Sequence, residues 1–153
     1  MQRTAPQTKI GHAGVLAAAF LFAVLATGCT GCKKIDERDI NFVTTSEVQR
    51  LVARAANESK LLILFDTRPE AEFHAAHLPG ARNFTALQVD CELGKDPSIS
   101  RFDNIIVYAD HPNSAPAKAL TKRLMSARYK NVRLFDGGVA AWKQAGLSLY
   151  ASE

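Results

Sequence analysis

The stretch from Asp66 to Asn83 reads DTRPEAEFHAAHLPGARN, and it narrows the fold of this chain more than any other part. It follows the apolar run LLILF at 61–65, which is typical of a parallel strand covered on both faces. Pro69 suits the first turn of a short helix over 69–74. Pro79-Gly80 is a turn signal that leads to a third strand near 83–89. The stretch therefore predicts a strand, a short helix and a turn into another strand.

The rest of the chain continues this alternation. Residues 40–43 (INFV) predict a short strand, and Thr44 to Glu47 has the form of a capping box that opens a helix with an apolar face. Residues 92–103 are polar and irregular, whereas 105–108 (IIVY) is the most strand-like run, followed by an apolar-periodic helix after Ala117. The sequence therefore predicts an α/β fold with a central parallel sheet flanked by helices on both faces, and a ligand site outside the carboxyl ends of the strands.

Three motifs in order carry a family resemblance. The first is Asp-x-Arg-x-x-x-Glu-Phe-x-x-x-His-x-Pro-Gly-Ala-x-Asn at 66–83. Tyr-x-Asn-Val at 129–132 is the second, and Gly-Gly-x-x-x-Trp-x-x-x-Gly at 137–146, whose glycines allow a tight strand-to-helix turn, is the third. Together they resemble the signature of rhodanese-like domains, the single-domain relatives of thiosulfate sulfurtransferase, over residues 38–149. Arg128 stands where the family usually has glycine.

The resemblance implies a cysteine nucleophile at the end of the central strand, where this chain has Ala109. In the family, a loop wraps this cysteine so that backbone N–H groups stabilise a thiolate and then a persulfide. Alanine offers no such atom, and no cysteine follows Cys91. We therefore expect no persulfide-forming site of the usual kind. The corresponding pocket loop consists of Ala109, Asp110, His111, Pro112, Asn113 and Ser114.

Two hypotheses describe what this loop does instead. In the first, the Asp110 carboxylate accepts the loop N–H groups and leaves the pocket chemically quiet. In the second, Asp110 turns away and the vacant loop binds a small anion such as sulfate or thiosulfate. We expect Asp66, Arg68 and Glu72 to support the pocket: Asp66 by hydrogen bonds to loop backbone, and Arg68 by pairing with Glu72 or another nearby acid.

Other catalytic and cofactor patterns are weak. Asp110, His111 and Ser114 have the chemistry of a triad but lie within five consecutive positions, without a Gly-x-Ser-x-Gly elbow. The loop also lacks the cysteine and terminal arginine of related phosphatases. His74 and His77 do not have a zinc-ligand spacing, and His77 matches a structural position of the family. We therefore predict no catalytic residue, metal or cofactor.

The N-terminal segment predicts export. Arg3 and Lys9 precede an apolar run at 15–26 that is shorter than the roughly 20 residues of a membrane span. The run ends in Leu-Ala-Thr-Gly-Cys29, which resembles a bacterial lipobox; Cys32 is a weaker alternative, and an uncleaved anchor helix is another. We therefore predict a lipoprotein signal peptide at 1–28, a lipidated tether at 29–39 and a rhodanese-like domain at 40–150.

These features predict a location in the bacterial cell envelope, with the domain outside the cytoplasm. Thr30 after the lipidated cysteine resembles outer-membrane sorting, which would face the domain to the periplasm in a double-membraned bacterium. In a single-membrane organism it would lie on the cell surface.

Charge does not indicate a nucleic-acid partner. Without Arg3 and Lys9, the formal charge of +4 falls to +2. A cluster of basic residues on and after one predicted helix favours a solvated helix face, with weak attraction to anionic lipid headgroups as the alternative. The cluster consists of Lys118, Lys122, Arg123, Arg128, Lys130 and Arg133.

The cysteines separate two functional hypotheses. An oxidising compartment allows a Cys32–Cys91 disulfide, but we interpret Cys91 as a buried or partly buried free thiol. The first hypothesis is a membrane-tethered, catalytically inactive module that binds or regulates through a protein partner or a small anion. The second is a thiosulfate or persulfide sulfurtransferase that uses Cys91 as a displaced thiol. A fold retained without any ligand is a third outcome.

Overall fold

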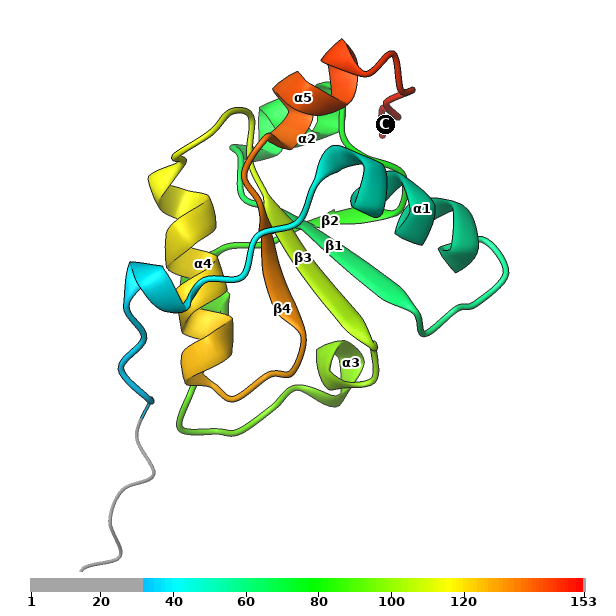
Figure 1. Ribbon diagram of the computed structural model, residues 1–153. Helices are drawn as coiled ribbons and strands as arrows, with labels where there is room; N and C mark the ends of the chain where they lie inside the picture. The colour runs from blue at the N-terminus through cyan, green and yellow to red at the C-terminus, as the bar shows by residue number, and fades with distance from the viewer. Residues whose placement is uncertain (1–31, 153) are drawn as a thin grey trace, which may run out of the picture.

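The fold is a four-stranded parallel sheet with helices on both faces (Figure 1), as the sequence predicts. A computed structural model describes residues 32–152. The predicted signal peptide and the predicted lipidation site Cys29 lie outside the described residues. The strand order is β2-β1-β3-β4, and every pair is parallel. The strands are β1 (Leu62–Asp66), β2 (Ala81–Asn83), β3 (Asn104–Tyr108) and β4 (Val132–Phe135).

Two buried clusters cover the two faces of the sheet. Side chains alternate along each strand, so that Phe65 and Val107 enter one cluster while Leu64 and Ile106 enter the other. The first cluster packs against α4 and the second against α1 and α5. The helices are α1 (Thr45–Ala55), α2 (Glu70–Ala75), α3 (Pro97–Ser100), α4 (Ala115–Ser126) and α5 (Gly138–Gln144), with 3-10 helices η1 (Glu37–Asp39) and η2 (Ala86–Gln88).

The N-terminal segment covers part of the edge strand β4. Phe42 forms an isolated parallel bridge with Leu134. The N–H of Val43 donates to the carbonyl oxygen of Leu134 at 3.0 Å, and the N–H of Leu134 donates to the carbonyl oxygen of Asn41 at 2.8 Å. The strand predicted at 40–43 is therefore reduced to a single bridge, which shields the edge of the sheet from other chains.

Two other predicted elements differ from the structure. The strand expected near 83–89 ends at Asn83, because Gln88 Oε1 accepts the N–H of Thr85 at 2.7 Å and turns the chain into η2. The segment 92–103, expected to be irregular, contains α3, which Asp96 caps by accepting the N–H of Ser98.

The capping box predicted at α1 is half formed. Thr44 Oγ1 accepts the N–H of Glu47 at 3.3 Å. The Glu47 side chain, however, pairs with Arg133 on β4, and no return bond to Thr44 is present among the described residues. A contact between distant parts of the chain thus replaces the local one.

Cys32 and Cys91 form a disulfide, with their Cα atoms 5.4 Å apart. Our interpretation of Cys91 as a free thiol is therefore wrong. The N–H of Lys33 donates to the carbonyl oxygen of Ser126 at 3.2 Å, and Arg123 Nε donates to the carbonyl oxygen of Val89 at 3.0 Å. Both cysteines are thus held beside the C-terminal half of α4, which sequence spacing cannot reveal. Within residues 32–152, no helix has the length and apolar character needed to cross a membrane.

Candidate binding site at the carboxyl ends of the strands

The candidate site lies where β1, β3 and β4 end. In the sheet register, Tyr108 at the end of β3 is paired with Asp66 on one side and with Phe135 on the other. The pocket loop, residues 109–114, follows Tyr108 and leads directly into α4. The structure thus brings the loop and Asp66 to the same edge of the sheet, which is where ligands bind in open parallel sheets.

Ala109 is buried at the base of the loop. Its carbonyl oxygen accepts the N–H of Val139 at 3.0 Å, and that of Asp110 accepts the N–H of Ala140 at 2.8 Å. Both donors belong to the first turn of α5. Gly138 makes this close approach possible, because its φ is +56° and a Cβ there would lie 2.3 Å from the Ala109 carbonyl oxygen.

The rest of the loop faces solvent. Asp110, His111, Pro112 and Asn113 are exposed, and Ser114 is half-buried. Asn113 has a positive φ of 64°, and its side-chain oxygen lies 3.3 Å from Lys118 Nζ. His111 Nδ1 lies 3.1 Å from the carbonyl oxygen of Pro112. The loop is therefore an exposed, polar segment on a buried and hydrogen-bonded base.

The hypothesis that Asp110 fills the loop is wrong. Asp110 is exposed, and within residues 32–152 no hydrogen bond reaches its carboxylate. Asp136 takes a loop donor instead: its Oδ1 accepts the N–H of Asn113 at 2.9 Å. Asp136 lies in the turn between β4 and α5, directly before Gly137. An acid at the end of a strand and next to the Gly-Gly turn was the signal that could have identified it.

The three residues with triad chemistry do not form a triad. No hydrogen bond among the described residues joins Asp110, His111 and Ser114 to one another. The His111 imidazole contacts the backbone of its neighbour, and the Ser114 side chain makes no capping hydrogen bond to α4. The Ser114 hydroxyl therefore has no hydrogen-bonded base in this loop that could activate it for nucleophilic attack.

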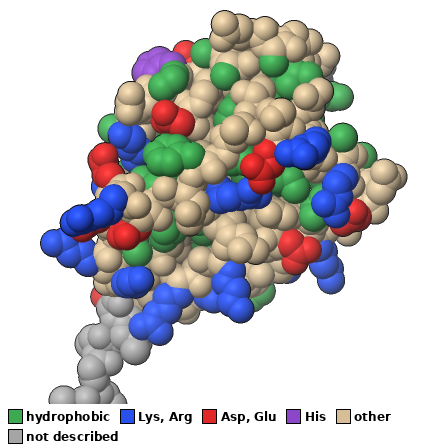
Figure 2. Space-filling model, in the orientation of Figure 1, with side chains coloured by type: hydrophobic (Ala, Val, Ile, Leu, Met, Phe, Trp, Pro, Cys, Tyr) green, Lys and Arg blue, Asp and Glu red, His purple; other side chains and the backbone are tan. Residues whose placement is uncertain are grey.

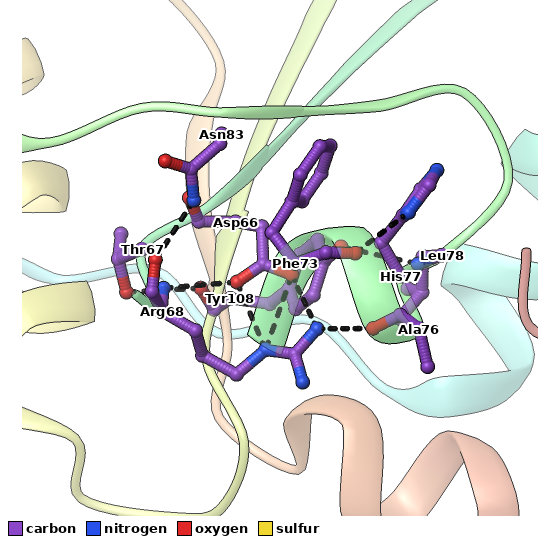
Figure 3. A network of polar contacts seen from close by, with 9 residues as sticks. All are labelled: Asp66, Thr67, Arg68, Phe73, Ala76, His77, Leu78, Asn83 and Tyr108. Carbon is purple, nitrogen blue, oxygen red and sulfur yellow. Dashed lines mark hydrogen bonds and ion pairs between the residues drawn. The ribbon is translucent and has the colours of Figure 1, made fainter. Parts of the chain in front are cut away.

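Beneath the loop, Asp66 and Arg68 form a buried ion pair (Figure 3). Arg68 Nη2 lies 2.7 Å from Asp66 Oδ2, and Arg68 Nε lies 3.1 Å from Asp66 Oδ1. The backbone N–H of Arg68 also donates to Asp66 Oδ1 at 3.0 Å, and this donor lies in the connection between β1 and α2, outside the pocket loop. Glu72 is exposed and forms no ion pair with Arg68. The acid that pairs with Arg68 is therefore Asp66.

The pair shifts the ionisation of Arg68. Burial alone lowers the pKa of this guanidinium, but hydrogen bonds and charge from Asp66 outweigh burial and raise the pKa above its ordinary value. The Arg68 guanidinium also donates to the carbonyl oxygen of Ala76, at the end of α2. Arg68 is therefore a charged brace that ties the end of β1 to the end of α2.

Side chains around the pair complete the support of the loop. Asn83 Nδ2 donates to the carbonyl oxygens of Asp66 at 3.2 Å and of Arg68 at 2.8 Å. Thr67 Oγ1 donates to the carbonyl oxygen of Tyr108 at 3.1 Å, immediately before Ala109. These bonds join the end of β1 to β2 and β3, so the base of the loop has little freedom to move.

Tyr108 and His77 have structural roles in the same network. The Tyr108 hydroxyl accepts the N–H of Leu78 at 3.1 Å, and burial, followed by the charge of Asp66, raises the pKa of Tyr108 above its ordinary value. His77 is buried against Phe73, with ring centroids 4.3 Å apart, and its Nδ1 lies 3.0 Å from the carbonyl oxygen of Phe73. No group of three His, Cys, Asp or Glu side chains within residues 32–152 has the arrangement of a metal site.

A family model described as "Rhodanese-like domain" matches residues 47–145. The chain belongs to the rhodanese-like domain family. The match covers β1 to β4 and the entire pocket loop. No curated protein sequence matches the chain.

Solved structures share the fold of this rhodanese-like domain. The BH2092 protein of Bacillus halodurans is 15% identical with a TM-score of 0.58, covering 75% of this chain and 80% of that chain. The human single-domain sulfurtransferase TSTD1 is 20% identical with a TM-score of 0.52, covering 67% of this chain and 95% of that chain. A thiosulfate sulfurtransferase of Pseudomonas aeruginosa is 18% identical with a TM-score of 0.56, covering 76% of this chain and 21% of that chain. At these identities the comparisons establish the fold alone.

The site of this rhodanese-like domain presents polar groups but, within residues 32–152, no free thiol. Position 109 carries only a methyl group, and the two cysteines within residues 32–152 are joined to each other, so this part of the chain offers no free thiol. Residues 109–114 line none of five surface cavities of about 310 to 620 Å³ found elsewhere on the described part. What the site presents is an exposed loop with carboxylate, imidazole and amide groups.

Proposed function

We propose that this protein is a rhodanese-like domain tethered outside the cytoplasm by a lipid on Cys29, and that its loop at 109–114 binds a protein partner without transferring sulfur. The single observation that carries the proposal is the buried methyl group of Ala109 at the base of the loop. Sulfur transfer needs a thiolate that is attacked and regenerated, and a methyl group has neither property.

The alternative nucleophile, Cys91, has poor access to this chemistry. It is buried and bonded to Cys32. A disulfide sulfur is not a nucleophile, so Cys91 would first require a reductant. The bond also supports the export proposal, since disulfides persist in oxidising compartments and are rare in the cytosol.

The form of the loop favours a protein partner over a small anion. Binding residues often lie on loops held by a rigid scaffold, and here the base is fixed by Thr67, Asn83 and the first turn of α5. Sulfate would have to displace the Asp136 carboxylate from the N–H of Asn113, next to the exposed carboxylate of Asp110. A partner that offers hydrogen-bond donors and cations can instead use both carboxylates.

Sulfur transfer is tested by thiocyanate formation from thiosulfate and cyanide, with the full-length chain purified in detergent. We expect no activity for the parent and a gain for Ala109→Cys, which restores a thiol at the base of the loop. Ala140→Cys, an exposed position in the first turn of α5, is the matched control and should gain nothing. An active parent that is inactivated by Cys91→Ser would overturn the proposal in favour of the displaced-thiol enzyme.

Partner binding is tested in living cells with a photoreactive amino acid at position 111 or, as a control, at Glu58. Glu58 is exposed and follows α1, away from the loop. We expect one cross-linked species specific to position 111, which is lost when Asp110→Asn and Asp136→Asn are combined. Equal cross-linked products at both positions would contradict a partner site on the loop. Products at position 111 that persist in the Asp110→Asn and Asp136→Asn double variant would contradict it too.

A further inference from the structure

Two leucines near the disulfide are almost completely exposed. Leu87 in η2 has 97% of its surface accessible, and Leu93, two residues after Cys91, has 87%. Asp90 Oδ1 accepts the N–H groups of Glu92 at 2.7 Å and of Leu93 at 3.3 Å, so the turn that presents Leu93 is fixed. Single exposed leucines are common on soluble proteins. Leu87 and Leu93 differ from such single leucines because they lie near the disulfide that follows the proposed lipid anchor at Cys29.

Basic side chains surround the same region. Leu87, Lys122, Arg123 and Ser126 line one cavity of about 530 Å³, and the N–H of Lys33 donates to the carbonyl oxygen of Ser126. Lysine and arginine side chains gather along the lower edge of the face in Figure 2, where the described chain begins. We call Leu87, Leu93, Lys33, Lys34, Lys122 and Arg123 the anchor-side surface.

Acidic residues are also present at this end of the molecule, and they offset part of its positive charge. Asp90, Glu92 and Asp96 are exposed close to Leu93. Two of them serve the backbone: Asp90 fixes the turn, and Asp96 caps α3. Against these three acids stand the four basic residues of the anchor-side surface and Lys95. Among these eight residues, the basic side chains outnumber the acidic ones by two.

Chain length then places this surface at the bilayer. Three peptide steps separate Cys29 from Cys32, and a fully extended chain spans about 3.5 Å per residue, so Cys32 lies within about 11 Å of the proposed lipid. The disulfide extends this restraint to Cys91 and hence to Leu93. Cationic residues and exposed leucines close to the proposed lipid anchor would add a second contact with an anionic bilayer beside that anchor.

We infer that the anchor-side surface docks on an anionic phospholipid bilayer, with Leu87 and Leu93 entering the headgroup region. The inference rests on the proposed lipidation of Cys29. Docking there also orients the domain: the pocket loop precedes the N-terminus of α4, whereas Lys33 contacts its C-terminus, and the 12 residues of α4 span about 18 Å. The loop is therefore held away from the bilayer and accessible to a partner.

Hydrogen–deuterium exchange of the full mature lipoprotein tests the docking in vesicles of phosphatidylcholine alone or with one quarter phosphatidylglycerol. We expect amides of residues 86–95 to exchange several-fold more slowly in the anionic vesicles, and high salt to reverse the difference.

Combined Leu87→Ser and Leu93→Ser should abolish the protection, whereas Tyr150→Ser, at an exposed aromatic residue elsewhere, should not. Each of Lys33→Gln and Lys34→Gln should lower the docked-to-undocked ratio about fivefold. Equal exchange in both vesicle types would overturn the inference.

The intact mass of the purified protein separates this inference from the proposed tether. A mass without acyl chains would refute lipidation while leaving the docking surface testable, by adding the same vesicles to the unmodified chain. In that arm, protection of residues 86–95 by anionic vesicles supports the surface on its own, and its absence refutes it. Circular dichroism of each variant checks that the fold is retained.

Discussion

The carboxylate of Asp66 holds the guanidinium of Arg68 two residues further along the chain, with Nη2 and Oδ2 2.7 Å apart and both side chains nearly inaccessible to water. The pair forms at the point where β1 ends, and the guanidinium also reaches the carbonyl oxygen of Ala76. Because the loop above it is exposed, this pair is the rigid part of the candidate site. Its loss should therefore be felt in the stability of the whole domain.

Replacing Asp66 with asparagine should cost about 3–5 kcal/mol of unfolding free energy, because the guanidinium of Arg68 would remain buried without its counter-charge. Urea denaturation at neutral pH measures the loss. The matched control is Glu58→Gln, which breaks the exposed Arg54–Glu58 pair and should cost at most about 1 kcal/mol. A similar cost for the two substitutions would show that the Asp66–Arg68 pair is not the brace we describe.

Gly138→Ala should destabilise the domain more than Gly80→Ala, although both glycines have positive φ angles of 56° and 71°. At Gly80 no heavy atom lies within 4 Å of the added Cβ, so only the backbone cost of roughly 1–2 kcal/mol applies. At Gly138 the methyl group meets the Ala109 carbonyl oxygen, and repacking should add about 1–3 kcal/mol. Equal losses in urea denaturation would mean that the loop moves aside freely.

Removing the disulfide should lower the unfolding free energy by about 4 kcal/mol on the chain-entropy estimate, because the bond closes a loop with a sequence separation of 59 residues. The combined Cys32→Ser and Cys91→Ser variant should match the parent measured in dithiothreitol, and reductant should not affect the variant further. Guanidinium denaturation with and without reductant provides the comparison. A denaturation midpoint of the parent protein that does not change with reductant would contradict the prediction.

Tyr108→Phe should cost about 1–3 kcal/mol at neutral pH, since the buried N–H of Leu78 loses its acceptor. The variant should also change the alkaline behaviour. Because the folded pKa of Tyr108 is raised, the tyrosine contributes full stability below its unfolded pKa near 10 and loses it as the pH rises towards the folded value. Urea denaturation between about pH 9 and 11 should therefore show a steeper decline for the parent than for Tyr108→Phe. Parallel curves would exclude this contribution.

The sheet was predictable because its signals are local. The buried runs of β1 and β3 are apolar on both faces, and the Gly137-Gly138 pair marks the turn into α5. These features are written in consecutive residues, so reading them needs no knowledge of distant contacts. The motif at 66–83 likewise predicted the position of the site at the carboxyl edge of the sheet.

The partners of individual side chains were not predictable in the same way. Arg68 has acids at positions 66 and 72 within reach in sequence, and only the end of β1 and the direction of α2 leave Glu72 exposed. The choice of Asp136 over Asp110 depends on how the turn after β4 approaches the loop. The Cys32–Cys91 bond depends on the course of the N-terminal segment along α4. Each is a contact between segments that sequence separation alone does not place.

The disulfide also determines how the domain carries mechanical load. Residues 41–43 are held to the edge of β4 by two backbone hydrogen bonds with Leu134, which a pull from the N-terminus could open one after the other. With Cys32 bonded to Cys91, tension on the proposed tether would pass through a covalent link into the segment beside α4 and bypass that edge. Drag on the proposed partner would then strain the proposed tether without stripping the N-terminal segment from the sheet.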